Sequence, residues 1–269
     1  MPHVAVERRD AVFEITLNRP EILNAVNRET IAALAAAVAE AGDDRAARAV
    51  LLRGAGKHFC AGGDITMFAE LIRLTPTQRQ KALYGIVDTL HPLLVRMRHM
   101  PKPVVAAVQG AAAGVGLSFV LAADLALAAD NAVFTSGYIH LGTSPDGGMT
   151  ATLPHIVGLK HAAELMLLGD RFDAHRALEL GLVNRVVPAE ELRARVQELA
   201  ERISLVPATT AQVTKRSINH TADLMGQSAS WEYHFMAHHW MHNTRTALDA
   251  LSARQQKTSM QDVFSEHRD

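Results

Sequence analysis

The chain has 269 residues, of which 48% are hydrophobic and 20% are charged, a balance typical of a folded globular protein. Its 27 Lys and Arg residues nearly balance 28 Asp and Glu residues, and the net charge of -1 gives no electrostatic case for nucleic acid as the main partner. Cys60 is the only cysteine, which excludes an intramolecular disulfide and a cysteine-based zinc site and favours a reducing, cytoplasmic location.

Neither a signal peptide nor a membrane span is expected. The opening MPHVAVERRD contains acidic side chains and lacks the apolar run of a signal peptide. Residues 104–123 carry no charge and are long enough to cross a membrane. Because glycines, many alanines, Gln109 and Ser118 dilute this segment, we interpret it as a buried strand, turn and helix.

The chain begins with a predicted β-hairpin. Apolar and polar residues alternate over residues 4–6 and 13–17, with Arg9 and Asp10 between them, and Pro20 lies beyond the second strand. An alanine-rich helix is predicted next, because apolar residues recur at helical spacing. These residues are Ile31, Leu34, Val38 and Ala41.

The middle of the chain alternates between strands and helices. Buried strands are predicted at residues 49–52, 104–108, 124–130 and 132–136. Helices are predicted at residues 66–99, divided near Pro76, and at 117–123, after a tight turn at 110–116. This alternation predicts an α/β fold with mostly parallel strand pairing.

The chain becomes mainly helical after Pro154, with one strand predicted at residues 183–187 and three or more helices over 189–255. We therefore expect a core over residues 1–200 and a helical region over 201–269. The helical region contains large apolar side chains at mixed spacing, which favours packing on another subunit. They are Trp231, Phe235, Trp240 and Met241.

Two glycine-rich turns carry the first chemical signal. Residues 58–65 (HFCAGGDI) and 109–116 (QGAAAGVG) each join a strand to a helix, and Asp64 is a candidate N-cap. Free backbone N–H groups at two such helix starts could bind one developing negative charge, as an oxyanion hole does. Taken singly, each turn is more simply explained as structural. Neither matches a phosphate loop, and Phe119 stands where a dinucleotide-binding motif needs glycine.

Several motifs together resemble the crotonase, or enoyl-CoA hydratase/isomerase, superfamily. The resemblance covers residues 4–220, with the motifs in the order and roughly the spacing of the family. They are LNRP with LNA at 17–25, FCAGGDI at 59–65, PKPVVAAVQGAAAGVG at 101–116, Ala123-Asp124, LGTSPDGGMTATLPHIVG at 141–158 and GDRFDAHRALELGLVNRVV at 169–187.

The resemblance implies a crotonase-like spiral of ββα repeats followed by a C-terminal helical region for trimerisation and active-site closure. It implies an acyl-CoA thioester as substrate, so that coenzyme A belongs to the substrate and neither a separate cofactor nor a metal is expected. The assembly would be a homotrimer or a dimer of trimers. The thioester oxygen would be held by the backbone N–H groups of Gly63 and Val115. Contacts with coenzyme A or the acyl group would come from Ile22, Leu23, Ala61, Gly62, Asp64, Ile65, Ser118 and Tyr138.

The residues at the acid–base positions favour one reaction within the family. Hydratases carry two glutamates that activate water, and this chain has Ser118 and Tyr138 at those positions, neither of which is a good base at neutral pH. Asp146 matches the carboxylate with which the family's isomerases move a proton. Without the resemblance, Asp146 beside Gly147 and Gly148 is a helix cap. With it, we favour an enoyl-CoA isomerase with Asp146 as acid–base.

Other activities stay open at this point. In 4-chlorobenzoyl-CoA dehalogenase an Asp at the position of Asp146 attacks the aromatic ring, and a tryptophan stands where this chain has Tyr138. A weak enoyl-CoA hydratase (a lyase), a thioester hydrolase and a non-catalytic CoA-binding scaffold are the remaining alternatives.

Several other residues are candidates for a function. On a strand His140 would face the same side as Tyr138, but a packed His is favoured, and Cys60 is expected to pack as a small core residue. Lys215-Arg216 and Lys257 could meet coenzyme A phosphates, although solvated charge is the simpler reading. Three histidines share a predicted helix face, where an interface is favoured over metal binding. They are His234, His238 and His242.

Overall fold

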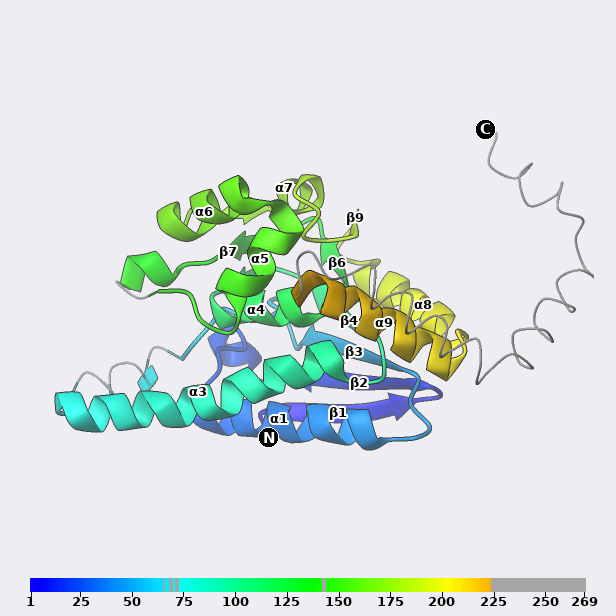
Figure 1. Cartoon of the computed structure of the whole chain (residues 1–269), viewed down its shortest axis with the longest axis horizontal. Coiled ribbons are helices and arrows are strands. Elements are labelled where there is room, and N and C mark those ends of the chain that lie inside the picture. Colours follow the sequence, from blue (N-terminus) through cyan, green and yellow to red (C-terminus); the bar gives the residue numbers. More distant parts are fainter. Residues whose placement is uncertain (65, 68–69, 71–72, 142–143, 224–269) are drawn as a thin grey trace, which may run out of the picture. The chain divides into compact units, whose positions relative to one another are not determined.

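The computed structural model describes residues 1–64, 66–67, 70, 73–141 and 144–223 (Figure 1). The chain divides into two compact units, residues 1–215 and 216–269, and only residues 216–223 of the second are described. Ile65, Trp231, Phe235, Trp240, Met241, Lys257 and the three histidines at 234, 238 and 242 therefore lie outside the described residues. The roles predicted for them, and for the region 201–269, stay predictions.

The main sheet has six strands in the order β1-β2-β3-β4-β6-β9. Strands β1 and β2 are antiparallel, with Val4 opposite Leu17, which confirms the predicted hairpin. The other neighbours are parallel, as the alternation of strands and helices predicts. The strands are β1 (Val4–Arg9), β2 (Val12–Leu17), β3 (Ala49–Gly54), β4 (Val104–Val108), β6 (Leu125–Ala129) and β9 (Arg185–Val187).

A second sheet of three short strands corrects the prediction for residues 110–116. It contains β5 (Ala111–Ala113), β7 (Val133–Thr135) and β8 (Phe172–Asp173), with β5 parallel to β7 and β7 antiparallel to β8. The segment 110–116 is therefore not one tight turn. Three alanines have no strand signal of their own, and β5 forms because its backbone pairs with β7 on one side and with Cys60 on the other.

The α-helices follow the predicted pattern, and the two short 3₁₀ helices were not predicted. Helix α1 begins after Asn27, whose side chain accepts from the Thr30 N–H at 2.9 Å, and α3 begins at Pro76 after a capping box of Thr75 and Gln78. One of these 3₁₀ helices, η2, forms where a strand would place Tyr138 and His140 on one side. The helices are η1 (Pro20–Ile22), α1 (Arg28–Asp43), α3 (Pro76–His99), α4 (Val115–Ala122), η2 (Tyr138–Leu141), α5 (Met149–Val157), α6 (Leu159–Leu168), α7 (Ala174–Glu179), α8 (Leu192–Ser204) and α9 (Ala208–Asp223).

The main sheet is covered on both faces, which explains why β4 has no polar residue. Val104, Ala106 and Val108 pack with α1, α3 and α4 in the larger core. Val105 and Ala107 point to the other face and pack with α8 in a smaller core. Helices α1 and α3 lie side by side on their face of the sheet (Figure 1).

The parallel pairing of β3 and β4 brings the two glycine-rich turns together. The first turn follows β3 and the second follows β4, and the carboxyl ends of neighbouring parallel strands lie at the same edge of a sheet. None of the helices in the described part of the chain is long and apolar enough to cross a membrane.

Candidate active site

The two glycine-rich turns are joined by backbone hydrogen bonds. The Cys60 N–H donates to the Ala111 carbonyl at 2.9 Å, and the Ala113 N–H donates back to the Cys60 carbonyl at 3.0 Å. Gly62 and Gly114 both have positive φ, of 103° and 53°. A Cβ at Gly62 would lie 3.1 Å from the Ala113 carbonyl oxygen, so a side chain there would push the turns apart.

The structure leaves the two N–H groups predicted for the oxyanion hole without partners. Neither the Gly63 N–H nor the Val115 N–H donates a hydrogen bond to any residue in the described part of the chain. Val115 is the first residue of α4, where backbone N–H groups have no partner within the helix. Two adjacent turns therefore each offer a free donor, which is what binding of a developing oxyanion requires.

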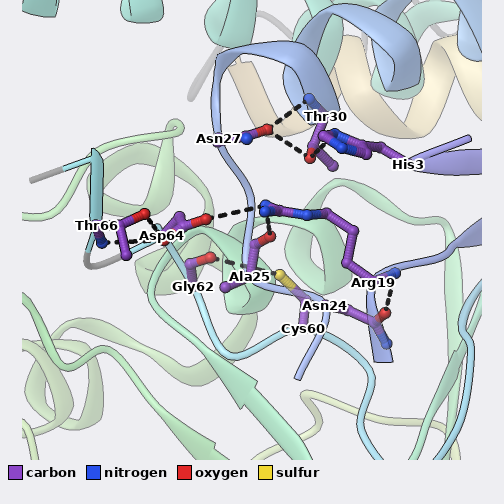
Figure 2. A network of polar contacts seen from close by, with 10 residues as sticks. All are labelled: His3, Arg19, Asn24, Ala25, Asn27, Thr30, Cys60, Gly62, Asp64 and Thr66. Atoms are coloured by element: carbon purple, nitrogen blue, oxygen red, sulfur yellow. Dashed lines mark hydrogen bonds and ion pairs between the residues drawn. The ribbon is translucent and has the colours of Figure 1, made fainter. Parts of the chain in front are cut away.

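An ion pair between Arg19 and Asp64 fixes the first turn (Figure 2). The Arg19 guanidinium lies 3.1 Å from Asp64 Oδ2 and also donates to the Ala25 carbonyl at 2.9 Å. Asp64 Oδ1 accepts from the Thr66 N–H at 3.0 Å and from its hydroxyl, as a helix N-cap does. Burial alone would raise the pKa of Asp64, but the hydrogen bonds from Thr66 and the charge of Arg19 hold that pKa below its ordinary value.

The loop that carries Arg19 is joined to the first turn along its length. The Ala61 N–H donates to the Leu23 carbonyl at 3.0 Å, and the Val26 N–H donates to the Gly62 carbonyl at 2.8 Å. The Asn24 amide is buried, and it donates to the carbonyls of Ala55 and His58 and accepts from the Arg19 N–H. Ile22 and Leu23, which the resemblance assigns to the wall opposite the turn, therefore lie in a loop held against it.

Arg19 and Asn24 are residues to which the sequence alone gave no role. Both lie inside motifs that the family resemblance quotes, so their presence is visible in the sequence. Their function is to hold the turn that presents Gly63. The partner of Arg19 is 45 positions away, and no local pattern indicates that pairing.

Asp146 lies between η2 and α5, and its carboxylate does not cap the helix. Gly148 occupies the N-cap of α5, and no side chain makes the capping bond. Instead the Tyr138 hydroxyl donates to Asp146 Oδ1 at 2.5 Å, and the Ser118 hydroxyl donates to the Asp146 carbonyl oxygen at 3.3 Å. The structure thus brings together Asp146, Tyr138 and Ser118, three of the residues predicted from the sequence.

Tyr138 can act only as a donor to Asp146 near neutral pH. Burial raises the pKa of Tyr138 strongly, and the negative charge of Asp146 raises it further, while hydrogen bonds from Ser118 and the Asp146 backbone oppose this to a smaller extent. The phenol therefore stays protonated. His140 is directed elsewhere, because its Nε2 lies 3.0 Å from the Gly169 carbonyl oxygen and the 3₁₀ helix separates it from Tyr138.

Two further candidates are buried structural residues. Cys60 is fully buried, its thiol donates to the Gly62 carbonyl, and burial raises its pKa to about 12, which supports the packing interpretation. Lys215 is only 5% exposed and forms an ion pair with Asp124 at 2.7 Å, so it is neither a solvated charge nor a free phosphate ligand. No three His, Cys, Asp or Glu side chains come together as metal ligands within the ranges that the structure describes.

Comparisons with known proteins identify the family. The family model of enoyl-CoA hydratase/isomerase matches residues 7–261. A 1,2-epoxyphenylacetyl-CoA isomerase of Escherichia coli K12 is 38% identical over 209 residues, covering 77% of this chain and 78% of that protein. A short-chain-enoyl-CoA hydratase of Clostridium acetobutylicum is 34% identical, covering 81% of each chain.

The solved structures agree with the sequence relatives. The crystal structure of an enoyl-CoA hydratase from Polaromonas sp. JS666 superimposes with a TM-score of 0.86 at 31% identity, covering 93% of this chain and 97% of that one. A crystal structure described as that of an enoyl-CoA hydratase from Streptomyces coelicolor A3(2) gives the same TM-score at 30% identity and covers 94% of this chain and 92% of the other. The α/β spiral predicted from the resemblance is therefore confirmed, and the chain belongs to the enoyl-CoA hydratase/isomerase (crotonase) family of acyl-CoA enzymes.

Proposed function

We propose that this protein is an enoyl-CoA isomerase that moves a carbon–carbon double bond, with Asp146 as the acid–base group. The Asp146 carboxylate takes a proton from carbon 2 of a 3-enoyl-CoA, and the electron pair of that bond delocalises onto the thioester oxygen. The resulting dienolate takes the same or an exchanged proton at carbon 4. The double bond then lies between carbons 2 and 3, and no atom is gained or lost.

The observation that carries this proposal is the hydrogen bond from Tyr138 to Asp146 at 2.5 Å. It shows that the Asp146 carboxylate is held by a neutral donor, which supports its use as the single carboxylate of an isomerase. The hydratase positions hold Ser118 and Tyr138, and neither residue supplies a base to activate water near neutral pH. A single carboxylate is enough for a proton shift, because the proton that it removes is returned.

The free N–H groups of Gly63 and Val115 supply the second requirement, which is stabilisation of the enolate oxygen. Their turns touch each other and are held from both sides by backbone pairing. Preorganised donors of this kind contribute most when the charge develops, and removal of one costs roughly 10²–10³ in rate. Coenzyme A enters as part of the substrate, so we propose no separate cofactor.

Two other reactions of the family are kept as alternatives. The Escherichia coli relative is named for isomerisation of 1,2-epoxyphenylacetyl-CoA, and several other relatives are named enoyl-CoA hydratases. An aryl-CoA epoxide isomerisation would use the same held carboxylate. Hydration would need a second base, and His91, which contacts the backbone of Gly147 beside Asp146, is the first residue to test.

We also propose the homotrimer, or dimer of trimers, that the resemblance implies. Helices α5, α6 and α7 expose large apolar side chains, which a water-facing surface does not need. Leu159 and Leu167 are 77% and 68% exposed. The others are Ile156, Leu168 and Leu178. The cytoplasmic location expected from the single cysteine stays a prediction.

The test is NMR of a 3-enoyl-CoA incubated with the enzyme in D₂O, in parallel with a 2-enoyl-CoA and a 1,2-epoxyphenylacetyl-CoA. We expect migration of the double bond with incorporation of deuterium, abolished in Asp146→Asn. Asp130→Asn, at an exposed carboxylate, is the matched control and should keep the activity. Faster formation of a 3-hydroxyacyl-CoA than of the migrated alkene would overturn the isomerase proposal in favour of a hydratase.

A further inference from the structure

Ser118 and Tyr138 occupy the two positions where hydratases carry glutamates. We propose that both are positioning residues for Asp146. Because Ser118 is small, the turn that contains Asp146 fills the space that the side chain of a second glutamate would need. This inference rests on the proposed function, since it concerns the same site. It gives a role to two side chains that would otherwise be described only as replacements of the two hydratase glutamates.

Tyr138 selects the oxygen of Asp146 that reacts. Its hydroxyl donates to Oδ1 at 2.5 Å, and no residue in the described ranges donates to Oδ2. Among the described residues only Oδ1 is therefore held by a donor, which leaves Oδ2 as the oxygen that we assign to take the proton. A hydrogen bond to a carboxylate also favours its ionised form, which is the form that acts as a base.

Ser118 holds the backbone carbonyl of Asp146. It is 1% exposed on α4, and its hydroxyl lies 3.3 Å from the Asp146 carbonyl oxygen. The next residue, Gly147, has a φ of 61°, and a Cβ there would lie 2.8 Å from Ser118 Oγ and 2.9 Å from Ser118 Cβ. The turn thus packs directly on Ser118, and a longer side chain at position 118 would displace it.

A third contact comes from α3. The Gly147 N–H donates to Nε2 of His91 at 3.3 Å. Among the described residues, the groups that contact the Asp146–Gly147 turn by hydrogen bonds from other elements are Tyr138 of η2, Ser118 of α4 and His91 of α3.

The first experiment is Tyr138→Phe, which removes the donor and keeps the ring. We expect kcat for isomerisation to fall about tenfold or more, the cost of losing one hydrogen bond to a charged group, with KM nearly unchanged. Tyr84→Phe, at an exposed tyrosine of α3, is the matched control and should change neither. An unchanged kcat in Tyr138→Phe, or a rise in KM alone, would overturn the positioning role.

A second experiment does not depend on activity. Urea unfolding midpoints of the wild type, Tyr138→Phe, Asp146→Ala and the double variant form a double-mutant cycle. We expect non-additive shifts, because either single change removes the same bond. Additive shifts would overturn the inference whatever reaction the enzyme performs. Non-additive shifts in an enzyme that moves no double bond would instead contradict the proposed function and leave the positioning role standing.

Ser118→Glu tests whether the turn that contains Asp146 fills the space beside Ser118. We expect it to lower isomerisation and to produce no hydration of a 2-enoyl-CoA, since the glutamate displaces the Asp146 turn. Ser118→Ala keeps the space, loses the hydroxyl and should lower kcat by less than Tyr138→Phe does. A gain of hydration in Ser118→Glu, or a larger loss in Ser118→Ala than in Tyr138→Phe, would overturn the inference.

Discussion

The guanidinium of Arg19 lies 3.1 Å from the carboxylate of Asp64, although 45 positions separate the two residues. Arg19 belongs to the loop after the N-terminal hairpin, and Asp64 ends the turn that presents Gly63. Both side chains are largely buried, so the pair is shielded from solvent. The geometry of one N–H group of the candidate oxyanion hole therefore depends on a loop at the start of the chain.

This pair should make stability depend on acid pH. The pKa of Asp64 is held below its ordinary value of 3.8, so its contribution is present at neutral pH and is lost as the pH falls through 3.8 toward the folded-state value. We expect Asp64→Asn to lose about 3 kcal/mol of unfolding free energy at pH 7, as when one partner of a buried pair is removed. The difference from wild type should shrink below about pH 4, measured by urea unfolding across pH. A constant difference across that range would contradict the assignment.

Val115→Pro removes the backbone N–H that we propose as the second donor of the oxyanion hole, and it leaves the other residues of the site unchanged. Proline lacks an N–H and is well accommodated at the first position of a helix, which Val115 occupies in α4. We expect kcat to fall by roughly 10²–10³, with a smaller effect on thermal stability. Val115→Ala keeps the N–H and serves as the control. Equal activity of the two variants would show that this N–H does not bind the thioester oxygen.

Lys215 should be far more important for stability than its place in a polar helix indicates. It pairs with Asp124 and donates to the carbonyls of Met97 at 2.7 Å and Lys102 at 2.9 Å. Because Lys215→Met removes a buried ammonium and leaves the Asp124 carboxylate, whose side chain is 20% exposed, without its partner, we expect a loss of about 3 kcal/mol. Lys160→Met, at an exposed lysine of α6, should stay within about 0.5 kcal/mol of wild type in chemical denaturation.

The thiol of Cys60 should be unreactive in the folded protein. It is fully buried beside the first turn, and burial raises its pKa to about 12, so the thiolate is scarce at pH 8. We expect no alkylation by iodoacetamide at pH 8 and full alkylation after unfolding in urea, measured by mass spectrometry. Rapid labelling of the native protein would mean that the turn opens.

The apolar side chains of α6 should control assembly. Leu159 and Leu167 are the two most exposed leucines in the described part of α5, α6 and α7. We expect Leu159→Glu combined with Leu167→Glu to convert an oligomer into a monomer in sedimentation velocity, because a charge in an apolar interface is strongly unfavourable. Glu164→Ala, on the same helix, should leave the assembly intact. A monomeric wild type would contradict the proposed trimer.

The sequence by itself determined most of the elements and the family resemblance. The hairpin, the parallel strands and the start of α3 at Pro76 follow from alternation, apolar runs and proline, which act over a few residues. The order of the motifs pointed to the crotonase family, and the identity of Ser118, Tyr138 and Asp146 already argued for one carboxylate.

Only the tertiary structure decided how those residues are used. The strand β5 exists because of its pairing partners, and the 3₁₀ helix at 138–141 directs Tyr138 to Asp146 and His140 to Gly169. Lys215 and Asp124, like Arg19 and Asp64, pair across long stretches of chain. Local patterns carry no information on such contacts, because the packing of many elements sets which distant side chains share a desolvated space.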